Sequence, residues 1–414
     1  MENTFFYFFL ISVFFFGSLT IGPLSVRVIM CIITLCLLFV HHKKLLNVGN
    51  LSNNLILLYC CFLVCMSIAM YFNGEFDEYG VIKVLLAFHL VCIVSYYAIR
   101  YYVNSNNTIN IVSIILITAI ILNSVVTILQ YIGNPLGWGI NLAITDARNE
   151  MVVRFSGSVS EGQTLLGIAK TPGLLDSAVA NGMFISSLGV IPFIYLSKIK
   201  DVKSKISKTI CWCSIGLSSV ACFMCQERAA LLMFVAALLY LLWNQIKNKL
   251  IIVIAFTIGI IYFALTPTYD ISGLGRFTDF SVGDDLRSNI WNTATTFISD
   301  NLMWGGPLHF LKIAGHFPHN FFFNALIYGG LIGGLFIIVL FIIIVIKVIK
   351  SIRRGNSSEE IVYATALLVY LMQGMFHNAS LVTGSVTIFV LLGLMEASKE
   401  ISENQENSED LCEY

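Results

Sequence analysis

Apolar runs long enough to cross a lipid bilayer recur along almost the whole of this 414-residue chain. A membrane-spanning helix needs about 20 mostly apolar residues, because each residue advances the helix by only about 1.5 Å. Hydrophobic residues make up 57% of the sequence and charged residues only 12%, proportions that soluble domains of this length do not show. The sequence therefore predicts an all-α polytopic membrane protein.

The apolar runs predict about twelve transmembrane helices in a single transmembrane domain, residues 1–397. The first run, Phe5 to Phe16, has no basic segment before it and no small-residue cleavage site after it. It is therefore interpreted as the first span rather than as a removable signal peptide. The predicted spans are 4–21, 25–40, 55–72, 81–99, 109–131, 176–197, 209–226, 229–244, 250–266, 320–348, 361–377 and 381–397.

Short basic loops predict how these spans are oriented. Four of them fall on the same side of the membrane in this count: 41–44, 198–208, 247–249 and 347–354. By the positive-inside rule that side is the cytoplasm, and both termini lie there. The acidic turn 75–78 and two long loops, about 132–175 and 267–318, then lie outside. The tail 398–414 is polar and acidic, and its composition predicts disorder.

Charge and cysteine content bear on two questions: whether the protein binds nucleic acid, and whether disulfides support its long loops. The 24 basic and 24 acidic residues give zero formal net charge, so the sequence does not indicate a nucleic-acid partner. Most of the 11 cysteines lie in apolar spans and the two long loops have none, so no disulfide framework is predicted there. The pair Cys222 and Cys225 is interpreted as helix packing.

The two long external loops hold the polar residues from which a site could be built. Loops longer than about 15 residues in a compact protein are usually functional or disordered. In the second loop, Ile290, Trp291, Ala294 and Phe297 recur at helical spacing, which predicts an amphipathic helix at the bilayer surface. The candidate residues of the two loops are Arg154, Arg276, Asp285, Arg287, Trp304, His316 and His319.

Two histidines, His316 and His319, come immediately before an apolar span. Pro318 separates them, so they do not form the regular helical pair of a zinc site, and no metal or other cofactor is predicted. Arg228 lies in the polar break between two apolar spans, 209–226 and 229–244. It is predicted to face the same side of the membrane as the two long loops. Two interpretations of Arg228 remain: it lies at the lipid headgroups of a tight helical hairpin, or it points into a cavity shared with Arg287 and His319.

Arginine and histidine together suit one kind of chemistry at a membrane surface. Arginine offers a planar fork of donors that fits the oxygens of a diphosphate. Histidine accepts a proton from an attacking hydroxyl near neutral pH. A membrane enzyme acting on a lipid-linked diphosphate sugar needs both groups, one for the leaving diphosphate and one for the acceptor.

Three segments, in this order along the chain, resemble the O-antigen polymerase and ligase superfamily of bacterial surface-polysaccharide assembly. They are Glu227-Arg228-Ala229-Ala230-Leu231-Leu232, the Arg287-x-x-x-Trp291 segment, and the glycine pairs Gly305-Gly306 and Gly329-Gly330 around His319-Asn320. One departure is Glu227, where the family commonly has Ser or Thr.

The resemblance implies a metal-independent membrane glycosyltransferase in the bacterial inner membrane, working on its periplasmic face. The implied substrates are an undecaprenyl-diphosphate-linked glycan donor and an acceptor, with a chain-length regulator protein as a further partner. Arg228 and Arg287 would bind the donor diphosphate, and His319 would be the base or would position the acceptor. The second-tier substrate-binding candidates are Arg154, Arg276, His316, Asp285 and Trp304; for Trp304, anchoring of the loop at the interface is the favoured alternative.

Three functions remain open at this point. An O-antigen polymerase is favoured, because two long loops with separate basic residues could hold two diphosphate-linked substrates. The alternatives are an O-antigen ligase acting on lipid A-core, and a flippase for the same lipid-linked sugar. A flippase is expected to show internal repeats and charges near the bilayer midplane, whereas the sequence shows no repeat between its halves and its spans are nearly free of charge apart from Lys83.

Overall fold

The computed structural model describes residues 2–16, 19–21, 24–40, 50–78, 80–144, 171–175, 177–198, 205–225, 227–243, 281–377 and 380–412. These residues form two compact units, unit 1 (Met1–Ile115 and Gly283–Tyr414) and unit 2 (Leu116–Val282). Each unit is described by itself. Apart from the short hairpin of β1 (Thr20–Ile21) and β2 (Leu24–Ser25), the regular structure in the described part of the chain is helical.

Unit 1 contains most of the helices. Its elements are α1 (Glu2–Phe15), α2 (Val26–Val40), α4 (Asn50–Phe72), α5 (Val81–Val84), the π-helix η1 (Leu85–Leu90), α6 (Val91–Tyr102), the first part of α7 (Asn106–Tyr131), α16 (Ser281–Asp300), α17 (Pro307–Ala314), α18 (Phe321–Arg354), α19 (Ser358–Gly374) and α20 (Val386–Cys412).

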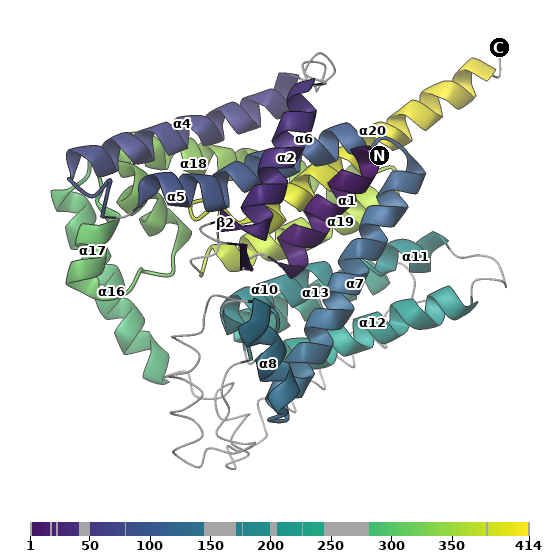
Figure 1. Ribbon diagram of the computed structural model, residues 1–414, viewed down its shortest axis with the longest axis horizontal. Coiled ribbons are helices and arrows are strands. Elements are labelled where there is room, and N and C mark those ends of the chain that lie inside the picture. The colour runs from purple at the N-terminus through teal and green to yellow at the C-terminus, as the bar shows by residue number, and fades with distance from the viewer. Residues whose placement is uncertain are drawn as a thin grey trace. The chain divides into compact units, whose positions relative to one another are not determined.

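The most extensive helix contact in unit 1 joins α4 and α18, which lie side by side in Figure 1. Gly329 and Gly333, at the spacing that predicts close packing, face α4. A Cβ on Gly329 would lie 3.1 Å from the Phe62 ring, and one on Gly333 would lie 2.9 Å from Cys65 Cβ. The absence of side chains at these two positions therefore lets the helices approach closely. A second group of contacts joins α20 to α6 and α19.

Unit 2 is a smaller helical group. It contains the rest of α7 and the helices α8 (Pro135–Ile144), α10 (Ala178–Leu188), α11 (Phe193–Lys198), α12 (Lys205–Met224) and α13 (Arg228–Trp243). Helix α10 packs on α12 and α13, and α12 packs on α13. The turn between α12 and α13 is short, as the predicted helical hairpin requires.

Five helical segments in the described residues are long and apolar enough to cross a membrane: Asn54–Phe72, Val81–Tyr102, Asn106–Tyr131, Ala178–Leu196 and Phe321–Arg354. Four shorter apolar helices lie at Asn3–Phe15, Val26–Val40, Lys208–Met224 and Ala229–Trp243. This supports the predicted class of helical membrane protein. The count of twelve stays a prediction, and the expected span 250–266 lies outside the described residues.

The polar tail from Ser398, whose composition predicts disorder, continues α20 as a helix to Cys412. The first turns of this tail contact other parts of unit 1. Arg100 donates to Glu400, and Asn356 Nδ2 lies 3.2 Å from both carboxylate oxygens of Glu406. Composition could not predict these contacts, because Arg100 and Asn356 lie far from the tail in the sequence.

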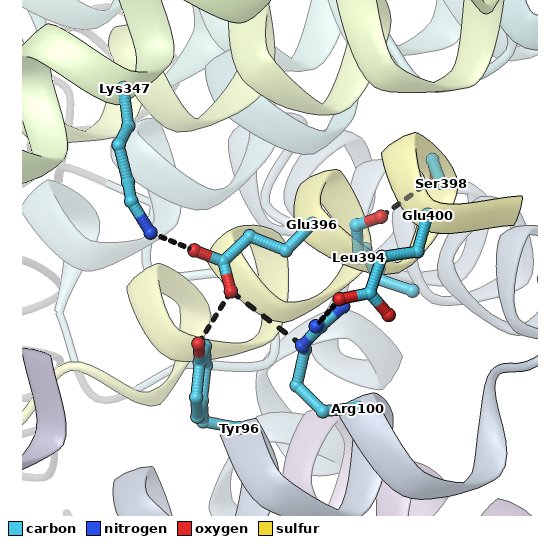
Figure 2. A network of polar contacts seen from close by, with 7 residues as sticks. All are labelled: Tyr96, Arg100, Lys347, Leu394, Glu396, Ser398 and Glu400. Atoms are coloured by element: carbon cyan, nitrogen blue, oxygen red, sulfur yellow. Dashed lines mark hydrogen bonds and ion pairs between the residues drawn. The ribbon is translucent and has the colours of Figure 1, made fainter. Parts of the chain in front are cut away.

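A largely buried ionic network ties three helices of unit 1 together. Figure 2 shows Glu396 of α20 at its centre. One oxygen accepts from Lys347 of α18 at 2.5 Å. The other accepts from Tyr96 of α6 at 2.5 Å and lies 3.6 Å from Arg100 Nε. Paired charges of this kind hold α6, α18 and α20 in one register, because separating them would leave a buried charge without a partner.

Two polar clusters lie near opposite ends of α18. Lys347, close to the end of α18, meets Glu396 and Arg100, and the 73–78 turn meets α17, which packs at the start of α18. The orientation of these ends in a membrane stays a prediction.

His89 is a core residue. It lies in η1, is 1% exposed, and its Nδ1 is 2.6 Å from the Tyr59 hydroxyl of α4. Arg27 of α2 donates to the carbonyl of Ala87 in the same π-helix at 2.9 Å. The wider π turn is therefore supported by side chains from two neighbouring helices.

Candidate functional site

The described part of 267–318, the segment predicted to be a long external loop, is mostly helical. The amphipathic helix predicted around Trp291 is confirmed as α16, in which Ala294 and Phe297 are buried. Trp291 Nε1 donates a hydrogen bond of 2.8 Å to the carbonyl of Pro318, and its ring lies edge-on to Phe323. Trp291 therefore fastens α16 to the segment that precedes α18.

Two of the predicted site residues, Asp285 and Arg287, lie on α16. Arg287 is four residues, about one helical turn, before Trp291. Both backbones are described, and their side chains lie outside the described part. The helix that carries Arg287 is thus joined directly to the segment that carries His319.

His319 has an unusual backbone. Its φ is 49°, the only positive φ of a non-glycine residue in the described part of the chain. The left-handed conformation costs a residue with a Cβ roughly 1–2 kcal/mol. His319 is held in it from both sides, because the Pro318 carbonyl is bonded to Trp291 and the Asn320 side chain caps α18 by accepting from Phe322 N and Phe323 N. Backbone strain that is fixed in this way is concentrated at functional sites.

His316 lies just after α17 and is exposed. Aromatic rings form a row in which each ring contacts the next: Phe297, Phe310, Phe317 and Tyr328, with centroids 5.3–6.3 Å apart. The row joins α16, α17 and α18. No single segment of the sequence revealed it, because the rings come from different elements.

The segments that carry the two glycine pairs of the resemblance bond to each other through backbone groups next to the glycines. Gly330 interrupts α18 with φ 59° and ψ −163°. Around this break, Gly306 N donates to Ile327 O at 2.8 Å and Leu331 N donates to Leu302 O at 2.8 Å. A Cβ on Gly330 would collide with the carbonyl of Met303, and one on Gly305 would collide with the carbonyl of Ile327. Glycine is required at both positions because backbone meets backbone there.

Trp304, a predicted substrate-binding residue, lies at the edge of this contact. Its ring centroid is 4.8 Å from that of Phe72 at the end of α4, and the residue is 44% exposed. The exposed residues Leu302 and Met303 come immediately before it. This setting favours the alternative that Trp304 anchors the loop at the membrane interface.

Arg228 lies in unit 2, at the first position of α13. Its backbone is described and its side chain is not. The preceding Glu227 is buried, and α10 packs so closely that a Cβ on Gly182 would lie 3.1 Å from Glu227 Cβ. The predicted cavity shared by Arg228, Arg287 and His319 would join residues of both units, and it stays a prediction.

Unit 2 also contains a buried amide network that sequence reasoning missed. It surrounds the backbone of residues 171–175, at the end of the predicted loop 132–175. Gln130 and Asn141 bond to Gly173, with N···O distances of 2.7–2.9 Å. Asn123 accepts from Leu174 N at 2.7 Å, and Asn181 donates to Thr171 O at 2.9 Å. The available signal was the presence of Asn and Gln in otherwise apolar spans.

Asn181 also donates to Cys225 Sγ at 3.1 Å, and Cys222 is fully buried. Both cysteines are buried in the helical packing, as predicted, and Cys225 also accepts a hydrogen bond, which was not predicted. No group of three or more His, Cys, Asp or Glu side chains within the described ranges could hold a metal ion. The candidates Arg154 and Arg276 lie outside those ranges.

Comparison with protein-family models found no match, and comparison with curated proteins found none either.

The backbone contact at Gly330 generates a prediction. We expect Gly330→Ala to lower the thermal stability of the purified protein markedly, because the new Cβ would strike the Met303 carbonyl. Gly315→Ala is the matched control, since Gly315 also has a positive φ, 71°, but has open space around its Cβ position. The control should cost only about 1 kcal/mol, the strain of the backbone itself. Equal melting temperatures for the two variants in detergent would contradict the backbone contact.

Proposed function

We propose that this protein is a membrane glycosyltransferase of the O-antigen polymerase type, which joins undecaprenyl-diphosphate-linked oligosaccharide repeat units at the periplasmic face of the bacterial inner membrane. The observation that carries the proposal is the fixed, strained backbone of His319, joined through Pro318 and Trp291 to the helix that bears Arg287. The order of the three motif segments along the chain is the second support.

The proposed reaction is a displacement at the anomeric carbon of the donor glycan. The acceptor hydroxyl oxygen forms the new bond to that carbon as the bond from the carbon to the diphosphate oxygen breaks. His319 takes the proton of the attacking hydroxyl. Arg287 and Arg228 stabilise the charge that develops on the leaving diphosphate. No metal or other cofactor is required by this scheme.

We expect Arg228→Ala and Arg287→Ala to lower polymer formation by about 10²–10³-fold, the usual effect of removing a group that stabilises developing charge. His319→Ala should lower it by about 10²–10⁴-fold, the range for loss of a general base. Arg287→Lys should not restore full activity, because an ammonium group cannot grip two diphosphate oxygens at once. The assay is polymer formation from purified lipid-linked repeat units, with and without a chelator.

The matched control is Arg353→Ala, which removes an exposed arginine near the other end of α18. It should leave activity unchanged. Normal polymer from all three alanine variants, at normal protein levels, would rule out the proposed site. Loss of activity on chelation would rule out the metal-independent scheme.

The proposed orientation has its own test. Reporter fusions in the lysine-rich loop 198–208 should report the cytoplasm, and fusions within 267–318 should report the periplasm. The same compartment from both positions would refute the twelve-span count and the location of the site together.

Deletion of the gene separates polymerase from ligase. We expect surface lipid capped with a single repeat unit, because ligation of an unpolymerised donor would continue. A bare lipid core, with long polymer accumulating on the carrier, would identify the protein as the ligase instead.

A further inference from the structure

The acidic turn between α4 and α5 reaches into the second long loop. Glu75 is 5% exposed, although it lies in a loop predicted to face the outside. Its Oε1 accepts from His309 N at 2.8 Å, and its Oε2 accepts from Leu308 N at 3.2 Å. The acceptor and the donors are more than 230 residues apart in sequence.

The start of α17 explains why this carboxylate is needed. The first N–H groups of a helix have no partner within it. Pro307 has no N–H, and Phe310 is the first to bond backward, to Gly306 O at 2.9 Å. The residue at the cap position is Gly306, which has no side chain to accept from Leu308 and His309. Glu75 takes over the role that a local Ser or Asp would normally fill.

Glu75 itself is held rigidly by the end of α4. Glu75 N donates to Met70 O at 2.8 Å and Gly74 N donates to Tyr71 O at 3.1 Å, with Gly74 in the left-handed conformation at φ 69°. These two bonds form the Schellman motif that ends many helices. The carboxylate is therefore presented from a fixed backbone, and its charge is favourable at the positive end of the α17 dipole.

Two further contacts join the same segments. Asn73 Nδ2 donates to Gly305 O at 3.2 Å. Lys312 Nζ lies 2.8 Å from Glu78 Oε1, but both side chains are more than half exposed, and such pairs contribute little. The buried Glu75 is thus the main polar contact between the turn and α17.

We infer that Glu75 is a positioning residue for the candidate site: it fixes α17 and, through the short segment after it, the left-handed backbone at His319. The inference rests on the proposed function, since it is His319 and Arg287 whose placement would matter. Glu75 itself is not proposed to touch substrate.

Hydrogen exchange measures the two capping bonds directly. In the full-length protein in detergent, we expect Glu75→Ala to speed exchange in peptides covering 302–314 by about tenfold, the usual consequence of losing a helix cap. Glu75→Gln keeps one good acceptor and should give a smaller effect; it also serves if the alanine variant does not fold. Glu78→Ala, which removes an exposed carboxylate from the same turn, should leave exchange unchanged.

Kinetics then test the link to the site. With lipid-linked repeat units as substrate, Glu75→Ala should lower kcat by about tenfold or more, because a small displacement of a reacting group is costly. KM should change by less than about twofold. Glu75→Gln should recover part of the kcat, and Glu78→Ala should behave as wild type.

The outcomes separate the inference from the function it rests on. Unchanged exchange in Glu75→Ala, or faster exchange with unchanged kcat, overturns the positioning role while leaving the proposed function standing. If wild-type protein and Arg287→Ala are equally active or equally inactive on this substrate, it is the proposed function that fails, and the exchange result still decides whether Glu75 holds α17.

Discussion

The break of α18 at Gly330 is the constraint on which the candidate site depends. In a bilayer, backbone N–H and C=O groups must find partners inside the protein, since no water is present to satisfy them. The break is accepted because Leu302 O bonds Leu331 N and Gly306 N bonds Ile327 O. The segment 302–306 is consequently part of the hydrogen bonding of α18. Helix α16 ends and α17 begins at this contact, so the contact fixes the positions of both helix ends.

Unit 1 uses charge differently at its two ends. At one end Glu396 of α20 pairs with Lys347 of α18 and with Arg100 of α6, so these contacts join three helices. At the other end Glu75 has no cation among its described contacts and instead accepts two backbone N–H groups. The first arrangement locks helix to helix. The second joins a helix start to a turn from a distant part of the chain.

Local patterns in the sequence predicted local features of the fold. The repeat of Ile290, Trp291, Ala294 and Phe297 predicted α16, and the spacing of Gly329 and Gly333 predicted close packing, here against α4. Long-range partners were not predictable. The role of Gly330 depends on a backbone carbonyl at Met303, and the role of Glu75 depends on a helix start more than 230 residues away. From the sequence alone, an acidic turn is interpreted as a solvated surface. A single sequence does not show which distant N–H groups its carboxylates accept from.

The backbone of His319 links the strain in the structure to the proposed chemistry. Glycine or asparagine would adopt a φ of 49° at lower cost, so conformation alone does not favour histidine at this position. Hydrogen bonds hold the residues on either side, from Trp291 to Pro318 O and from Asn320 to the start of α18. Under the proposed function, general-base catalysis would account for a histidine at this position, because a base must be held at a set distance from the hydroxyl it deprotonates.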